Sequence, residues 1–147
     1  MNHALNFIFI IVTALLLFYS CKTTQVSPEQ YEKAKIYFGN GGGFTGKLNE
    51  YCMLSNGEVY RVNPASREAT LRNTVNRSET KTLFKEIKNA NLNQYPYDKP
   101  GNMFFWMKHY TSIDTTYLIW GNQDIETDTN VINIYEQLVA MSKQAKQ

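Results

Sequence analysis

The feature that most constrains this chain is an uncharged apolar run at its start, from Leu5 to Tyr19, which ends at Ser20-Cys21 and then turns polar. Its apolar segment, Phe7 to Phe18, is roughly a dozen residues long, short of the ~20 that a helix needs to cross a bilayer. A run of this length and position is typical of an export signal. We therefore expect residues 1–20 to be a signal peptide that takes no part in the fold.

The residues before Cys21 resemble the lipobox of bacterial lipoproteins. Ser20 and Cys21 match that motif, whereas Phe18 stands where Leu is usual and Tyr19 where a small residue is usual, a looseness that resembles lipoproteins of the Bacteroidota. The resemblance implies that Cys21 carries a diacylglyceryl thioether and becomes the mature N-terminus. Each buried CH₂ contributes ~0.8 kcal/mol, so two or three acyl chains form an essentially permanent membrane anchor. An ordinary cleaved signal and an uncleaved anchor helix are the alternatives.

The residues after Cys21 indicate in which membrane the protein is anchored. Lys22 stands where lipoproteins retained in the inner membrane carry Asp, and no acidic run resembling a surface-export tag follows. The resemblance therefore implies an outer-membrane anchor with the protein on the periplasmic side, as in small uncharacterised lipoproteins of Bacteroidota. Residues 21–32 are polar and predict a tether. Residues 33–147 should form one domain, because about 125 residues suffice for one core and not for two.

Composition narrows the partners and the chemistry of this domain. A formal net charge of +2 without a basic cluster argues against nucleic acid as a partner. Once Cys21 is acylated, Cys52 is the remaining cysteine, so no intramolecular disulfide is available. Cys52 lies in the apolar run 51–54, where a free cysteine usually acts as a small hydrophobe. We expect no cofactor.

A first hairpin is predicted around Asn56-Gly57, because an Asn-Gly pair between two β-rich runs is typical of a tight turn. Residues 45–54 and 58–62 should pair antiparallel, and a two-residue turn places Leu54 opposite Val59. Four side chains then share the face that we expect to be buried: Tyr51, Met53, Tyr60 and Val62.

Two amphipathic helices and a second hairpin follow. Residues 103–110 and 115–120 are rich in aromatic and β-branched side chains, which predicts the second hairpin. Asn76 or Ser78 can cap the first helix, and Asp128 or Thr129 can cap the last.

The resulting ββαββα order predicts an α+β fold with an antiparallel four-stranded sheet and both helices on one face. Residues 36–38 can add a strand, and a short strand near residues 69–71 is a second option.

The glycine-rich stretch matches a nucleotide-binding motif in letters only. Residues 41–46 read G-x-G-x-x-G, but that motif needs a strand before it and a helix after it, and here a strand is predicted to follow. The stretch therefore predicts a flexible or tightly folded entry to a strand.

No metal site or catalytic set is predicted. Asp124, Glu126 and Asp128 alternate like the first ligands of a calcium loop, but the positions for its Gly and bidentate Glu are filled by other residues. His109 is the only histidine beyond the signal, which excludes zinc sites built on several imidazoles. His109 and Asp114 have no nucleophile-elbow sequence beside them, so we expect no enzyme.

Asp114-Thr115-Thr116 resembles the three-residue O-glycosylation signal of Bacteroidota. It lies next to a predicted turn, which would leave it accessible. The resemblance makes it a weak candidate modification site.

The remaining candidate site is aromatic. Side chains alternate between the two faces of a strand, so residues 103–110 must send large side chains to the face without helices as well as to the covered one. The predicted partner-binding residues are Phe104, Trp106, Tyr110 and Trp120. This face is either a contact surface for an envelope protein or glycan, or it is covered by residues 63–77 or 36–38.

The leading hypothesis is a non-enzymatic accessory or binding lipoprotein of the cell envelope. The alternative is a periplasmic inhibitor of a hydrolase of the protease or lysozyme type, in which the glycine-rich stretch or residues 63–77 insert into the enzyme.

Overall fold

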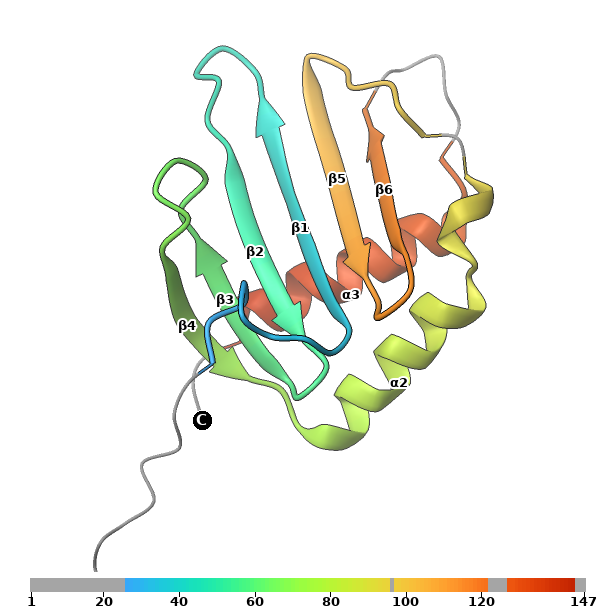
Figure 1. The fold of residues 1–147 in the computed structure, drawn as a ribbon. Coiled ribbons are helices and arrows are strands. Elements are labelled where there is room, and N and C mark those ends of the chain that lie inside the picture. Colours follow the sequence, from blue (N-terminus) through green and yellow to red (C-terminus); the bar gives the residue numbers. More distant parts are fainter. Residues whose placement is uncertain (1–25, 96, 122–126, 145–147) are drawn as a thin grey trace, which may run out of the picture.

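The computed structural model describes residues 26–95, 97–121 and 127–144. They form one antiparallel sheet of six strands and two α-helices (Figure 1). The strands lie in the order β4-β3-β2-β1-β5-β6. In chain order the elements are β1 (Lys35–Gly42), β2 (Asn49–Leu54), β3 (Glu58–Val62), β4 (Ala69–Thr74), α2 (Arg77–Asn89), the 3-10 turn η1 (Leu92–Gln94), β5 (Met103–Tyr110), β6 (Thr115–Trp120) and α3 (Thr129–Lys143).

The signal peptide and Cys21 lie outside the described residues. In the part of the chain that is described, neither helix has the length and apolar character needed to cross a membrane.

The predicted four-stranded sheet is wrong, because the two optional segments are both strands. β4 extends one edge, while β1 lies at the centre and pairs with β2 and β5. Glycines concealed β1 in the sequence. A Cβ at Gly39 would lie 2.1 Å from the Asn49 carbonyl oxygen and 3.0 Å from Trp106 Nε1, so this position requires glycine for close packing. Residues 39–42 are therefore the second half of the central strand, whereas residues 43–46 form the turn that leads toward β2.

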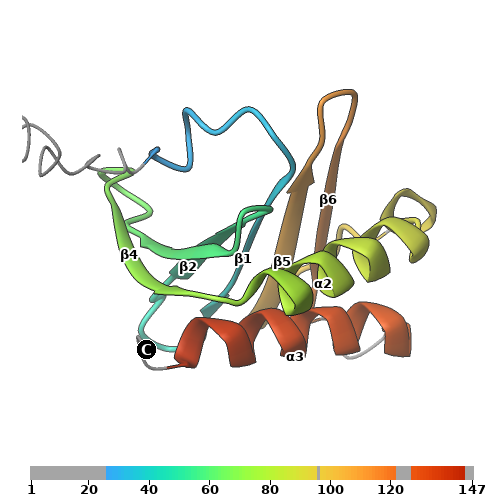
Figure 2. The same ribbon diagram turned by 90° about the horizontal axis from the view of Figure 1, so that it is seen from below.

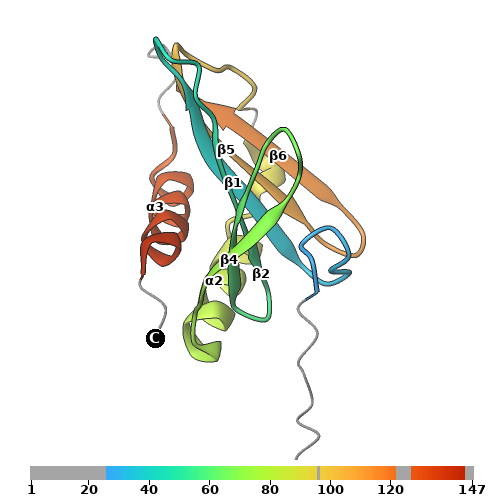
Figure 3. The same cartoon turned by 90° about the vertical axis from the view of Figure 1, so that its left-hand side faces the viewer.

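Both helices cover the same face of the sheet (Figures 2 and 3). Asn76 caps α2 by accepting a 3.0 Å hydrogen bond from the Glu79 N–H, and Asp128 caps α3 by accepting one of 2.7 Å from the Asn130 N–H. The apolar stripes of the helices then face inward. The largest fully buried side chains include Ile36, Phe38, Met53, Leu83, Ile87, Met107, Leu118 and Leu138.

The register of the first hairpin differs from the prediction by one residue. The connection between β2 and β3 has three residues instead of two, and it closes through a 2.9 Å hydrogen bond from Gly57 N–H to the Leu54 carbonyl, with Gly57 at φ +99°. Met53 therefore pairs with Val59. Because a slip of one residue exchanges the faces of a strand, the predicted shared face is wrong: Tyr51 and Met53 pack with the helices, whereas Tyr60 and Val62 belong to the opposite face.

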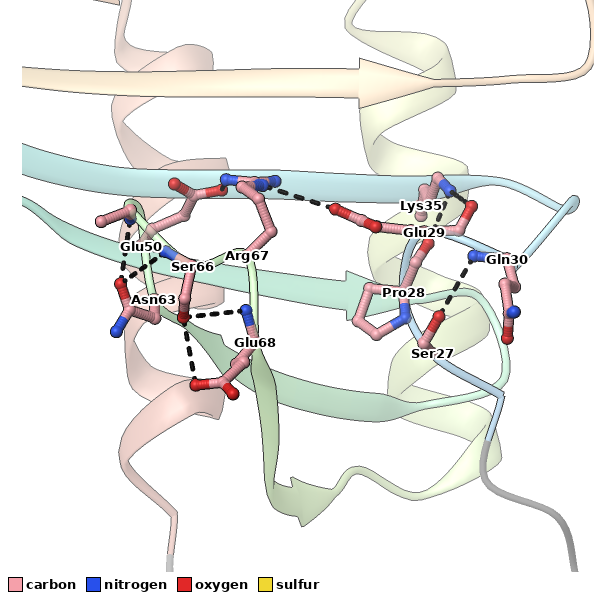
Figure 4. Close-up of polar contacts among 11 residues, drawn as sticks. Ser27, Pro28, Glu29, Gln30, Lys35, Glu50, Asn63, Ser66, Arg67 and Glu68 are labelled. Carbon is pink, nitrogen blue, oxygen red and sulfur yellow. Dashed lines mark hydrogen bonds and ion pairs between the residues drawn. The ribbon is translucent and has the colours of Figure 1, made fainter.

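That opposite face is covered along β1 to β4 by residues 26–34, which cross it before β1 begins (Figures 2 and 4). The Lys35 ammonium donates to the Pro28 carbonyl at 2.6 Å, and the Tyr31 hydroxyl lies 2.9 Å from Ser55 Oγ. The prediction that residues 21–32 form a tether therefore does not hold for residues 26–32, because from residue 26 onward the chain packs on the domain.

Arg67 fastens this segment to the sheet (Figure 4). Its guanidinium lies 2.7 Å from Glu50 Oε1 and 3.5 Å from Glu29 Oε1, and it also lies over the Tyr37 ring at 5.6 Å from the ring centre. Glu50 is only 6% exposed, and the Arg67 guanidinium is the ion-pair partner of its carboxylate. The β3–β4 connection, which carries Arg67, thus links Glu50 of β2 to Glu29 of the N-terminal segment, on the face of the sheet away from the helices.

We expect Arg67→Ala to lower the free energy of unfolding by about 1–2 kcal/mol, because it leaves the buried Glu50 carboxylate without its partner. Urea denaturation measures this change. The exposed Arg61 is the matched control, and Arg61→Ala should change stability by less than about 0.5 kcal/mol. Adding Glu50→Gln to Arg67→Ala should restore part of the loss; no recovery would show that the ion pair does not account for it.

Candidate functional site

The structure places the four predicted partner-binding residues on two different faces of the sheet. Phe104, Trp106 and Tyr110 lie on the face away from the helices, as the alternation in β5 predicted. Trp120 lies on the opposite face, because it pairs directly with Phe105 across the hairpin. Residues opposite each other in an antiparallel ladder share a face. The four residues therefore do not form one surface.

Most of that aromatic face is interior. Trp106 is 8% exposed and belongs to a second core with Tyr37 and Ile119, while Phe104 and Tyr110 are half-buried against it. Tyr110 meets Tyr37 edge-on at 5.7 Å. Of the two alternatives given for this face, the burial of Trp106 fits the covered one. Residues 36–38 belong to the sheet as part of β1, and the N-terminal segment contributes Tyr31 to this core.

A different apolar feature is exposed at one end of the sheet. Phe44 lies in the β1–β2 loop and is fully exposed, and Met103 at the start of β5 is 51% exposed beside it. Gly43 fixes the loop: its N–H donates to the Asn102 carbonyl at 2.7 Å, and a Cβ there would lie 2.8 Å from Met103 Sδ. We name Phe44, Gly43 and Met103 the distal tip, because it lies at the end of β1 opposite Lys35 (Figures 1 and 3).

A groove lies at the other end of the sheet, between α2, η1 and the β5–β6 hairpin. Its volume is about 480 Å³, within the range of ligand clefts. Its apolar side chains are Ala34, Phe84, Ile87, Leu92 and Ile113, and its polar ones are Ser55, Lys88, Asn91, Asn93, His109, Thr111, Ser112, Asp114 and Thr116.

Most of the polar groups on one wall of the groove satisfy one another. Asn93 donates to Asp114 Oδ2 at 2.6 Å and accepts a hydrogen bond from the Thr116 hydroxyl. Asp114 Oδ1 accepts from the Thr115 N–H at 2.7 Å. In contrast, His109 Nε2 is buried and has no hydrogen-bond partner among the described residues. Among the described residues that line the groove, it is therefore the one buried side-chain polar atom without a partner.

The imidazole of His109 is held neutral by its surroundings. Burial lowers its pKa below the usual value of 6.5, and the negative charge of Asp114 opposes that shift. The ring also lies near Phe84, with 6.3 Å between the ring centres.

The described residues contain no evident catalytic arrangement. His109 and Asp114 line the same groove, yet they form no hydrogen bond with each other or with Ser112. Cys52 is free and fully buried, and burial raises the pKa of its thiol to about 12, so it is not poised as a nucleophile.

No group of three metal-ligating side chains occurs in the described ranges. Asp124 and Glu126, two of the residues considered for a calcium loop, lie outside them. Thr115, the acceptor of the glycosylation-like triplet, is exposed, and its modification stays a prediction.

Sequence reasoning missed the groove, and it considered the distal tip only as part of the glycine-rich stretch that could insert into an enzyme, without singling out Phe44 or Met103. Phe44 gave a usable signal, because it is a large apolar residue between glycines and polar residues that belongs to no apolar stripe. The groove gave none, because its walls come from three separate segments. No protein-family model matches the chain, and no curated protein matches it.

We expect His109 to titrate below pH 6.5 in an NMR pH titration, because burial disfavours its charged form. Asp114→Asn should lower the pKa further, since it removes the charge that favours protonation. The unfolded chain binds a proton more readily than the fold, so stability should fall as pH drops from 6.5 through the folded pKa. His109→Phe should flatten that dependence; an unchanged profile would assign it to other groups.

Proposed function

We propose that this protein is a lipid-anchored, non-enzymatic binding protein of the cell envelope, and that the distal tip contacts its protein partner. The observation that carries the proposal is the full exposure of Phe44 on a loop fixed by glycines. Contiguous exposed apolar surface marks interaction sites on proteins, and buried aromatic anchors dominate binding energies in interfaces.

The arrangement of the chain supports a tip directed away from the membrane. The Val26 carbonyl accepts a hydrogen bond from the Tyr60 hydroxyl at 3.4 Å, and Tyr31 lies against Ser55, at the end of β2 away from the tip. Five residue steps separate Cys21 from Val26, so an anchor at Cys21 holds the domain within about 17 Å of its lipid. β1 spans roughly 23 Å from Lys35 to Gly42 and carries the tip outward. The outer membrane, periplasmic side, is the proposed location.

A periplasmic inhibitor of a hydrolase is the second candidate, and the shape of the β1–β2 loop favours it. A projecting hairpin with an aromatic residue at its end can insert into an enzyme cleft. The other loop considered, residues 63–77, does not project in this way, because Arg67 holds it to Glu50 and the next residues form β4.

The anchor is tested by the intact mass of the protein extracted from its native envelope. We expect a chain that begins at Cys21 and carries two or three acyl groups. A chain that is cleaved without acylation, or uncleaved, would contradict the anchor and leave the distal-tip proposal to stand by itself.

We expect Phe44→Ser to abolish co-purification of the specific envelope partner that crosslinks to the wild-type protein. Ile113→Ser is the matched control, because Ile113 is 94% exposed at the opposite end of the sheet. Quantitative mass spectrometry of crosslinked envelopes compares the variants. Equal recovery of the partner with Phe44→Ser and with the wild-type protein would contradict the distal-tip proposal. If the wild-type protein inhibits a lysozyme or protease stoichiometrically and Phe44→Ser does not, the inhibitor function is favoured instead.

A further inference from the structure

The N-terminal segment, residues 26–34, covers part of the second core and is itself little buried. Pro28 is buried and Tyr31 and Ala34 are half-buried, whereas the other residues of the segment are exposed. Cys52, which belongs to the core beneath, has no exposed surface. The segment is therefore a cover with almost no apolar interior of its own.

Cys52 lies under this cover. It pairs with Tyr37 of β1 on one side and with Tyr60 of β3 on the other, and residues opposite each other in a ladder share a face. Pro28 lines a small cavity together with Tyr37 and Val62, which lie on the two strands that flank β2. The helices cover the opposite face, so the N-terminal segment is the outer layer over the Cys52 thiol (Figure 2).

The backbone of the N-terminal segment is not part of the sheet. Within the described ranges it makes one backbone–backbone hydrogen bond to the rest of the domain, from the Ser55 N–H to the Ala34 carbonyl at 3.0 Å. This bond lies where the segment joins β1, so it holds the hinge of the segment and not its length. Regions without ladder hydrogen bonds and with few buried apolar contacts open at a lower free energy than the strands beside them.

Side-chain contacts hold the length of the segment (Figure 4). The Lys35 ammonium donates to the carbonyls of Pro28 and Glu29 at 2.6 and 3.1 Å. The Glu29–Arg67 ion pair is long, at 3.5 Å, and its side chains are 59% and 43% exposed, so it contributes little. Lys35 is therefore a main polar fastening of the segment.

We propose that the N-terminal segment opens as a unit while the six-stranded sheet stays folded. Opening uncovers an apolar strip of β1, β2 and β3 that contains Cys52, and it adds the residues of the segment to the linker that precedes them. A segment of this length reaches about 30 Å when extended. With the proposed anchor at Cys21, on which this consequence rests, the open domain stands up to about 30 Å farther from its lipid. The device couples the height of the domain above the membrane to exposure of the second core.

The test measures how fast N-ethylmaleimide modifies Cys52 in the protein as the cell processes it, purified in nonionic detergent. Mass spectrometry follows the tryptic peptide 48–61, which contains Cys52, so the result does not depend on whether Cys21 is acylated. Low reagent concentrations keep closing faster than modification, and the rate then reports the open fraction. We expect a rate that changes little over urea concentrations at which circular dichroism shows a folded sheet, because local opening exposes little surface.

Two lysine variants assign the fastening. Lys35→Met should speed the modification of Cys52 about tenfold, because it removes both hydrogen bonds from the ammonium to the segment. Lys33→Met is the matched control, since Lys33 is exposed and makes no hydrogen bond or ion pair in the described part of the chain. Its rate should stay within about twofold of the wild-type rate.

Three outcomes would overturn the proposal. One is a rate that rises with urea as steeply as global unfolding does, and another is an equal acceleration by the two lysine variants. The third is no modification of Cys52 in the folded protein. None of them bears on the distal tip, which the crosslinking of Phe44→Ser tests separately.

Discussion

The packing of β5 aromatic rings over glycines of β1 is the constraint on which the rest of the structure depends. Trp106 crosses β1 at Gly39, and Phe104 lies against Gly41, where an added Cβ would come within 2.7 Å of its ring. β1 joins the two hairpin halves of the sheet, so its pairing with β5 holds β6 and β2 in one layer. Larger residues at these glycines would separate the halves and expose both the helix-side core and the second core.

Local chemistry was predictable from the sequence, and long-range packing was not. The caps at Asn76 and Asp128 and the alternation in β5 follow from a few neighbouring residues, and they are correct. The central strand was predicted only as an optional segment over residues 36–38, because its glycines weaken the β signal over the rest of it, and their use appears only when Trp106 is in place. The face of Trp120 and the walls of the groove depend on register and on contacts between distant segments, which no local pattern contains.

The two ends of the sheet differ in chemical character. One end is apolar and projecting, with Phe44 at its extremity, and the other is concave and carries the neutral imidazole of His109. The strands between them form a rigid spacer, because central β-ladders open only with most of the fold. The distal tip and the groove are therefore held apart at a fixed separation.

The path of residues 26–34 has a mechanical consequence. Tension applied from the N-terminal side reaches first the contact of Tyr60 with the Val26 carbonyl and the pair of Glu29 with Arg67, and only then β1. These contacts can be broken one at a time, whereas β1 is hydrogen-bonded on both sides along its length and must be sheared. Residues 26–34 therefore detach from the sheet at a lower force than the force that shears β1, so the central strand stays paired while this segment extends.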